Sequence, residues 1–316
     1  MARDLELLTV GRIGVDLYCD QVGAGWPQAR SFSRAIGGSP TNVAVAAARL
    51  GRRAAVFTKV GSDPIGEMAR AELREFGVDE RFVGVEQGTV TPLSFAVLDP
   101  PEDPQLLMRR DPPVPDLQLR EDEVDRSTVV AVPLLWITAG ALSQEPSAST
   151  VTAMLDVRDR RRHTILDLDY RPAMWRSREH ASETIGAAVD HATIAVGNRE
   201  ECEIAVGTGD PSGAARRLLE RGVELALVKL GGEGVLVASA ERQQLLAPPR
   251  IQVLCGLGAG DAFGGALCHG LLSGWCYERA AAFANAAGGI VASRLLCSAA
   301  MPNEREVLEL LETPVA

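Results

Sequence analysis

The stretch Cys255-Gly-Leu-Gly-Ala-Gly-Asp-Ala-Phe-Gly-Gly265 decides how this chain is interpreted. Its glycines run directly into an apolar helical pattern, so we expect a tight turn followed by a helix. The N–H groups of Gly258, Ala259 and Gly260 would then lie unpaired at the helix N-terminus, where a phosphate-like anion is stabilised. Asp261 stands inside this anion site, where a carboxylate is useful for taking a proton from a hydroxyl that attacks the phosphate. The alternative is that Asp261 only caps the helix.

The composition is that of an ordinary globular protein with a surplus of acidic residues. A formal charge of −10 over 316 residues argues against nucleic acid or an anionic membrane as the main partner. The six cysteines show no CxxC spacing, so neither a zinc site nor a redox motif is indicated. We find no export signal and no apolar run of ~18 residues. These features predict a reduced, cytoplasmic protein without a membrane segment.

Strand and helix patterns alternate along most of the chain. This alternation predicts a mainly parallel sheet with helices on both faces, a three-layer α/β/α architecture. Two segments, about 12–36 and 89–111, depart from it and have the pattern of inserted strands. We expect them to form a small β lid over a site, or an interface that would make a homodimer through lid strands. Residues 1–316 are expected to form a single domain with these insertions.

Polar candidates follow the first strand patterns. Asp16 comes just after a buried strand, where open α/β sheets bind ligands, and could accept hydrogen bonds from a polyol. A loop aspartate that bonds its own backbone is the alternative. Gly37 and Gly38 precede a predicted helix and would let a ligand touch the backbone, although a plain strand-to-helix turn also explains them. Asn42, in the first turn of that helix, would face such a ligand.

Two further polar clusters end strands in the second half of the chain. The segment Asp167-Leu-Asp-Tyr-Arg-Pro172 supplies Asp169 and Arg171. Its arginine could bind a carboxylate or phosphate with two hydrogen bonds, or form an ordinary surface ion pair. Asn198 and Glu201 lie on one side of a first helical turn and could hold Mg²⁺ through water, or simply cap the helix.

A third cluster, Lys229-Leu-Gly-Gly-Glu-Gly234, ends its strand in glycines. Gly231, Gly232 and Gly234 suit close approach of a nucleotide to the backbone. A hairpin turn explains the same glycines equally well.

Taken together, these residues resemble the PfkB, or ribokinase-like, family of carbohydrate kinases over nearly the whole chain. Gly37-Gly38 with Asn42 is similar to the family's N-terminal signature, and Asn198 to Glu201 is similar to its N-x-x-E motif. Gly258 to Phe263 is similar to its C-terminal signature. Three motifs in the right order and separation make a chance match improbable.

The resemblance implies a ribokinase-like kinase domain that uses ATP and Mg²⁺ to phosphorylate a small-molecule sugar or sugar acid. It implies that Asp261 is the base and that the N–H groups of Gly258, Ala259 and Gly260 form the anion hole. It also implies that Asn198 and Glu201 position Mg²⁺ through water, that Lys229, Gly231, Gly232, Gly234 and Asn285 lie along the nucleotide, and that Asp16, Gly37, Gly38 and Asn42 hold the acceptor.

Within the family, the chain is most similar to members that act on keto-deoxy sugar acids. Met108-Arg109 and the segment 167–175 carry this resemblance, and Asp169 stands where many relatives have asparagine. An acidic acceptor needs cations near it, and Arg171, Arg109 and Arg12 are available. We expect Arg171 or Arg109 to bind the carboxylate. A kinase for fructose, 2-keto-3-deoxygluconate or nucleosides is the enzymatic alternative, and a non-catalytic sugar-binding protein is another.

One segment departs from the family pattern. Members often have an Asp-Thr-Thr run before the glycine turn, associated with a monovalent cation, whereas this chain has Cys255, Gly256 and Leu257. The departure argues against activation by potassium. We expect Cys255 to be a small buried hydrophobe.

Overall fold

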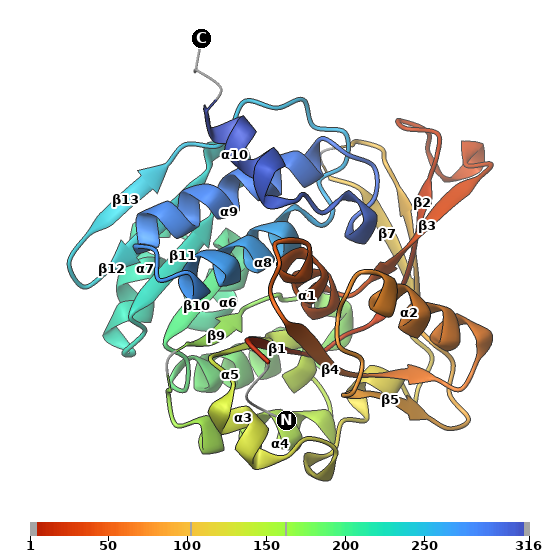
Figure 1. Ribbon diagram of the computed structural model, residues 1–316, viewed down its shortest axis with the longest axis horizontal. Coiled ribbons are helices and arrows are strands. Elements are labelled where there is room, and N and C mark those ends of the chain that lie inside the picture. The colour runs from red at the N-terminus through yellow and green to blue at the C-terminus, as the bar shows by residue number, and fades with distance from the viewer. Residues whose placement is uncertain (1–4, 102, 162, 313–316) are drawn as a thin grey trace.

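The computed structural model describes residues 5–101, 103–161 and 163–312. Within these ranges one large sheet contains strands β1 (Leu7–Val10), β4 (Ala54–Gly61), β5 (Val83–Glu86), β8 (Leu134–Thr138), β9 (Thr164–Asp167), β10 (Ile194–Asn198), β11 (Leu225–Lys229), β12 (Val235–Ser239) and β13 (Gln243–Leu246). Their order is β13-β12-β11-β10-β9-β8-β1-β4-β5 (Figure 1). Neighbours from β11 to β5 are parallel, and β12 and β13 join antiparallel at one edge.

Helices cover both faces of this sheet, because its strands are apolar on both sides. Leu7 packs into the core on one face and its neighbour Leu8 into the core on the other. The first core is covered by α1 (Ser39–Arg49), α2 (Pro64–Glu75), α8 (Ala259–Leu272), α9 (Tyr277–Ala292) and α10 (Glu304–Glu312). The second is covered by α3 (Arg126–Ala131), α4 (Ser147–Arg158), α5 (Arg178–Val189), α6 (Arg199–Val206) and α7 (Pro211–Glu220). The three-layer α/β/α prediction is confirmed.

Helices α1 and α8 pack closely because the glycine pair after Asp261 in α8 leaves room for α1. A Cβ at Gly265 would collide with Ala46 of α1, and one at Gly264 would collide with the ring of Trp136. The close approach brings the first turns of the two helices together. Asn42 therefore reaches Asp261.

A second, four-stranded sheet stands beside the large one and is here called the lid sheet. It contains β2 (Gly14–Cys19), β3 (Phe32–Gly37), β6 (Leu93–Val97) and β7 (Gln105–Arg109), in the order β3-β2-β6-β7. Its strands come from the two segments that the sequence analysis set apart. Figure 1 shows the lid sheet at one side of the molecule, next to α1 and α2. The ends of the predicted 1–316 domain, 1–4 and 313–316, lie outside the described residues.

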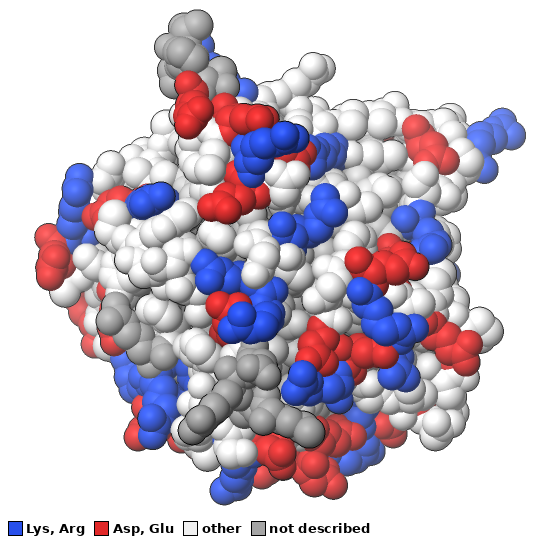
Figure 2. Space-filling view, viewed as in Figure 1, with Lys and Arg blue, Asp and Glu red and all other residues white. Residues whose placement is uncertain are grey.

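The surface carries no sign of a polyanionic partner on the face shown in Figure 2, where acidic and basic side chains are interspersed. Among the described helices, none has both the length and the apolar character needed to cross a membrane.

Candidate active site

Two connected cavities open at the edge of the large sheet where its parallel strands end. The lid cavity, about 390 Å³, is lined by the lid sheet and by the residues that follow β1, β9 and β10. The loop cavity, about 810 Å³, is lined by the turn after β11, the segment 248–253 and the facing sides of α8 and α9. Both are lined by Lys229, Gly231, Gly256 and Gly260, so they meet at the N-terminus of α8. Ligands of parallel α/β sheets bind at this edge.

The N-terminus of α8 forms the junction between the cavities. Gly258 is its N-cap and has φ +81°, a left-handed conformation that favours glycine. Ala259 and Gly260 begin the helix, and the N–H groups of a first turn have no intrahelical acceptor. Together with the helix dipole, these N–H groups make the junction an anion site.

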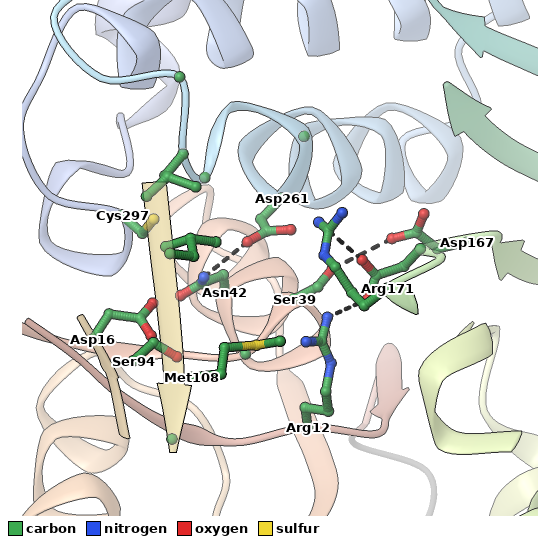
Figure 3. A pocket seen from close by; sticks show the side chains of 18 of the residues that line it. Arg12, Asp16, Ser39, Asn42, Ser94, Met108, Asp167, Arg171, Asp261 and Cys297 are labelled. Carbon is green, nitrogen blue, oxygen red and sulfur yellow. Dashed lines mark hydrogen bonds and ion pairs between the residues drawn. The ribbon is translucent and has the colours of Figure 1, made fainter. Parts of the chain in front are cut away.

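Asp261 lies in the first turn of α8 and points into the lid cavity (Figure 3). Asn42 Nδ2 donates a hydrogen bond of 2.8 Å to Asp261 Oδ2, which orients the carboxylate. Burial raises the pKa of Asp261, and hydrogen bonds from Asn42 and Ser39 oppose part of that rise. A carboxylate with a raised pKa beside an anion site is suited to accept a proton from a bound hydroxyl.

Asp16 occupies the lid-sheet side of the same cavity. It lies on β2, and a Cβ at Gly37 would collide with its carboxylate, so Gly37 makes room for this side chain. Gly38 has φ +97° and lines the cavity directly. Burial raises the pKa of Asp16 to about 6, while a hydrogen bond from Ser94 opposes the rise.

Two arginines face the cavity and are held by one carboxylate. Asp169 forms an ion pair with Arg12 and another with Arg171, whose N–O distance is 3.1 Å. Burial would raise the pKa of Asp169, but the two arginines hold it below its ordinary value. The Arg171 side chain is 43% exposed and lines the cavity, so it has a free face for a ligand. Figure 3 shows both arginines across the cavity from Asp16.

The prediction that Arg109 reaches this cavity is wrong. Arg109 pairs with Leu93 at the end of β7, is exposed, and lies on the sheet face opposite Met108. Because strand side chains alternate, Met108 and Arg110 face the cavity instead. Asp116 is fully buried; its Oδ2 accepts hydrogen bonds of 3.2 Å from Arg110 and from the Ile13 amide. The alternation of side chains along the strand could have identified Arg110, which lies two residues after Met108. Nothing in the sequence marks Asp116 as its partner.

Asn198 and Glu201 form a capping box at the start of α6. Asn198 Oδ1 accepts from the Glu201 amide at 2.9 Å, and Glu201 accepts from the Asn198 amide at 2.7 Å. The helix-cap alternative is therefore present, and both residues also line the lid cavity. Lys229 Nζ lies 3.8 Å from Glu201 and 3.9 Å from Asp167. Burial lowers the pKa of Lys229, but these carboxylates more than offset that and raise it overall.

Asp167 is a buried carboxylate that the sequence analysis did not single out as a site residue. Ser39 donates a hydrogen bond of 3.3 Å to its Oδ2, and its Oδ1 has no hydrogen-bond partner among the described residues. Burial and the charges of Asp169 and Glu201 raise the pKa of Asp167 to about 7, although Lys229 opposes the rise. An oxygen that lines the lid cavity without a hydrogen bond, with the Lys229 ammonium 3.9 Å away, suits water or a hydrated cation.

The loop cavity differs in chemistry. Gly231 and Gly232 have open space where a Cβ would be, so their backbone is accessible from the cavity. Gly234 has φ +101°, and a Cβ there would collide with the Leu246 carbonyl, so this glycine also serves the hairpin. Asn285 lines the far end, where its Nδ2 donates to the Ala247 carbonyl at 2.8 Å. Apolar side chains such as Val253 and Phe263 complete the lining.

The comparisons with known proteins agree with this geometry. The pfkB family of carbohydrate kinases matches residues 4–304. Curated proteins named 5-dehydro-2-deoxygluconokinase are similar over 98% of this chain: one from Bacillus anthracis is 30% identical, with 96% of that protein covered. One from Shouchella clausii is 31% identical, also with 96% covered. The chain belongs to the pfkB family of carbohydrate kinases.

Solved structures share the fold. A double mutant of a fructokinase from Vibrio cholerae, with fructose, ADP and a potassium ion bound, is 25% identical with a TM-score of 0.85, covering 98% of this chain and 99% of that one. An Escherichia coli protein in complex with ATP and Mg²⁺ has a TM-score of 0.87 at 21% identity, covering 98% of this chain and 100% of that one. The ribokinase-like fold is thereby established.

Proposed function

We propose that this enzyme transfers the γ-phosphoryl group of ATP to the primary hydroxyl of a keto-deoxy sugar acid, namely 5-dehydro-2-deoxy-D-gluconate, giving its 6-phosphate. Such a product belongs to the breakdown of inositol. The observation that carries the proposal is the pair of arginines beside a buried base: Arg12 and Arg171, held by Asp169, share one cavity with Asp261. The resemblance to proteins named 5-dehydro-2-deoxygluconokinase supports the same acceptor.

The acceptor would lie across the lid cavity. Its carboxylate would bind Arg171 and Arg12, because guanidinium groups match carboxylates in geometry and charge. Its middle hydroxyls would donate to Asp16 and bond Asn42. This orientation would bring the terminal hydroxyl to a carboxylate oxygen of Asp261. The reaction requires this contact, because Asp261 must take the proton of the hydroxyl that attacks phosphorus.

The transfer step then follows from the junction between the cavities. Asp261 takes the proton of the primary hydroxyl while that oxygen forms a bond to the γ-phosphorus, and the bond from phosphorus to the ADP oxygen breaks. The N–H groups of Gly258, Ala259 and Gly260 stabilise the charge on the transferring group. Lys229, on the other side, offers a cation to the same phosphates.

The nucleotide would occupy the loop cavity, with its phosphates along Gly231 and Gly232 and its base toward Asn285. The oxygens of Asp167, Asn198 and Glu201 suit Mg²⁺ held through water. Bound there, Mg²⁺ would neutralise phosphate charge. In the described residues, no three or more His, Cys, Asp or Glu side chains gather into a metal cluster, so water and phosphate oxygens would supply the remaining ligands.

We also propose a homodimer formed through the lid sheets, in the cytoplasm. The outer face of the lid sheet is partly apolar: Phe32 and Phe95 contact each other with ring centroids 5.7 Å apart, and Leu107 is 41% exposed. A second lid sheet of the same chain would cover this face. All six cysteines are free thiols, as suits a reducing compartment. Light scattering at working concentration tests the dimer, and a monomer there would contradict it.

The test of the reaction is a coupled ADP-release assay with Mg·ATP. The panel is 5-dehydro-2-deoxygluconate, 2-keto-3-deoxygluconate, fructose and a nucleoside, with wild type and Asp261→Asn measured side by side. We expect the first acid to give the highest kcat/KM and the variant to lose the activity. A higher kcat/KM on fructose or a nucleoside would contradict the acceptor, and sugar binding without turnover of any compound would contradict the kinase reaction.

A further inference from the structure

A small cluster of buried side chains packs against the anion hole, and the mechanism above gives it no role, although three of its residues, Tyr18, Leu257 and Cys297, also line the lid cavity. It joins the lid sheet to the segment before α8 and to the turn after α9. Its members are Tyr18, Ala35, Ala96, Leu98, Cys255 and Cys297, with Leu257, Leu295 and Leu296 packed against them. The cluster therefore touches both the acceptor side and the phosphate side of the site.

Tyr18 and Cys297 form the centre of this cluster. The Tyr18 hydroxyl and Cys297 Sγ are joined by a hydrogen bond in which either group can donate. The same hydroxyl donates to Asp16 Oδ2 at 3.4 Å. Burial raises the pKa of both Tyr18 and Cys297, so both stay neutral and act as hydrogen-bonding and packing groups. The thiol is accordingly a poor nucleophile.

Cys297 also contacts the backbone of the anion hole. A Cβ placed on Gly258 would collide with Cys297 Sγ and would lie 2.9 Å from its Cβ. The thiol is therefore packed against the N-cap whose left-handed conformation starts α8. A continuous line of contacts runs from Asp16 through Tyr18 and Cys297 to Gly258.

We propose that Tyr18 and Cys297 are positioning residues that hold the anion hole in place from below, and that they do so without a monovalent cation. The proposal rests on the phosphoryl transfer proposed above. A fructokinase with the same fold was solved with potassium bound. In this chain, by our proposal, the side chains of Tyr18 and Cys297 orient the N–H groups of Gly258 and Gly260 instead of a cation.

The donor set beneath the anion hole does not suit potassium. Potassium is bound in proteins by several oxygen atoms, and the side chains of Cys255, Leu257 and Cys297 supply none. Two backbone carbonyls of this region already accept hydrogen bonds: Ala292 O accepts from the amides of Leu254 and Cys255, at 2.8 and 3.1 Å. The Cys297 carbonyl accepts from the Ala300 amide at 3.0 Å. The side chains present therefore agree with the expectation, drawn from the sequence, that potassium does not activate this enzyme.

The first arm of the test measures cation dependence. Wild-type kcat with its best acceptor, and ADP affinity by calorimetry, are compared in potassium chloride and in choline chloride at equal ionic strength. We expect both quantities to agree within twofold. A tenfold gain of either in potassium would overturn the proposal. Turnover of no acceptor in either salt would count against the phosphoryl transfer itself, while the calorimetry still decides the cation question.

The second arm tests the positioning role with matched variants. Cys297→Ala and Tyr18→Phe should each lower kcat about tenfold, because small displacements of an anion hole are costly. Their double variant should fall little further, and ADP affinity should stay within twofold. Cys297→Ser, which keeps a hydrogen-bonding group, should recover most of kcat, and Cys276→Ala, at an exposed cysteine, should match wild type. A lower melting temperature with unchanged kcat in Cys297→Ala would overturn the positioning role.

Discussion

The two cavities that meet at Gly260 offer a ligand opposite kinds of surface. In the lid cavity almost every polar side chain is already paired with another: Asp169 with two arginines, Arg110 with Asp116, and Asp261 with Asn42. The loop cavity offers mostly backbone and apolar surface. A network of fixed charges discriminates between acceptors, because an ill-matched ligand leaves buried charges unpaired. A lining of glycine backbone and apolar side chains would instead suit ATP, the phosphoryl donor proposed above.

The difference predicts which substitutions alter chemistry, which alter acceptor recognition and which alter neither. The largest effect should come from Asp261→Asn, which keeps the shape of the side chain and removes the base. We expect kcat to fall by about 10²–10⁴-fold, with nucleotide affinity nearly unchanged. Calorimetry with ADP and steady-state kinetics check both halves. A variant with kcat within tenfold of wild type would mean that another group accepts the proton.

The next largest effect should come from Gly258→Ala at the junction. This alanine would have to adopt φ near +81° and would meet Cys297, so the N–H groups of the anion hole should be displaced. Loss of one such donor costs about 10²–10³-fold in kcat. Gly274→Ala is the control, since Gly274 has φ +71° with open space around it and lies just past the opposite end of α8. If Gly258→Ala and Gly274→Ala lost the same factor in kcat, general backbone strain would explain the loss, and the role of Gly258 in the anion hole would be contradicted.

A smaller effect, confined to the kinetics of the acceptor, should come from Arg110, which faces the lid cavity. Arg110→Ala should lower kcat/KM for the sugar acid by about 10–100-fold, because it removes a cation that faces the lid cavity and takes from Asp116, which holds the Ile13 amide beside Arg12, a charge-assisted hydrogen bond of roughly 1.5–3 kcal/mol. The KM for ATP should stay the same. Arg109→Ala, one residue away on the opposite face, should have no effect. A loss of kcat/KM in Arg109→Ala with none in Arg110→Ala would show that the register of β7 differs in the working enzyme.

The smallest effect concerns stability. The pKa of Asp16 is raised from 3.8 to about 6 by burial, so the folded state holds this proton more tightly than the unfolded state does. The contribution of Asp16 to the free energy of unfolding therefore falls as pH rises from about 4 to 6 and is steady above. Asp16→Asn removes that loss, so its melting temperature should gain a few degrees on wild type between those pH values. A difference that stays constant with pH would contradict the raised pKa.

Much of the fold was readable in the sequence, because apolar runs between helical patterns define a buried parallel sheet. The short strand β5 had too few residues to give a period, and it is recognised only by pairing with β4. The motif residues Asn42, Asp169, Asn198 and Asp261 do line one cavity. The prediction for Arg109 was wrong because strand side chains alternate between the two faces of the sheet, so an error of one residue changes the face.

Other features depend on contacts between distant segments, which a single sequence does not reveal. Asp116 holds the amide of Ile13, 103 residues away, and Tyr18 contacts Cys297 across 279 residues. Neither Asp116 nor Cys297 belongs to a sequence motif that would have singled it out. Arg12 and Asp169 were both named from the sequence, but the ion pair between them could not be predicted, because it also joins distant segments.

The most direct test of the central claim compares two acceptors in two proteins. The acceptors are 5-dehydro-2-deoxygluconate and the neutral analogue in which its carboxylate is replaced by a hydroxymethyl group; the proteins are wild type and Arg171→Ala. We predict that wild type prefers the acid by about 100-fold in kcat/KM and that the variant loses most of this preference, while its rate on the neutral compound changes less than about threefold, as expected for one charge-assisted pair. Equal losses on both compounds, or a wild-type preference for the neutral one, would contradict recognition of a sugar acid by these arginines.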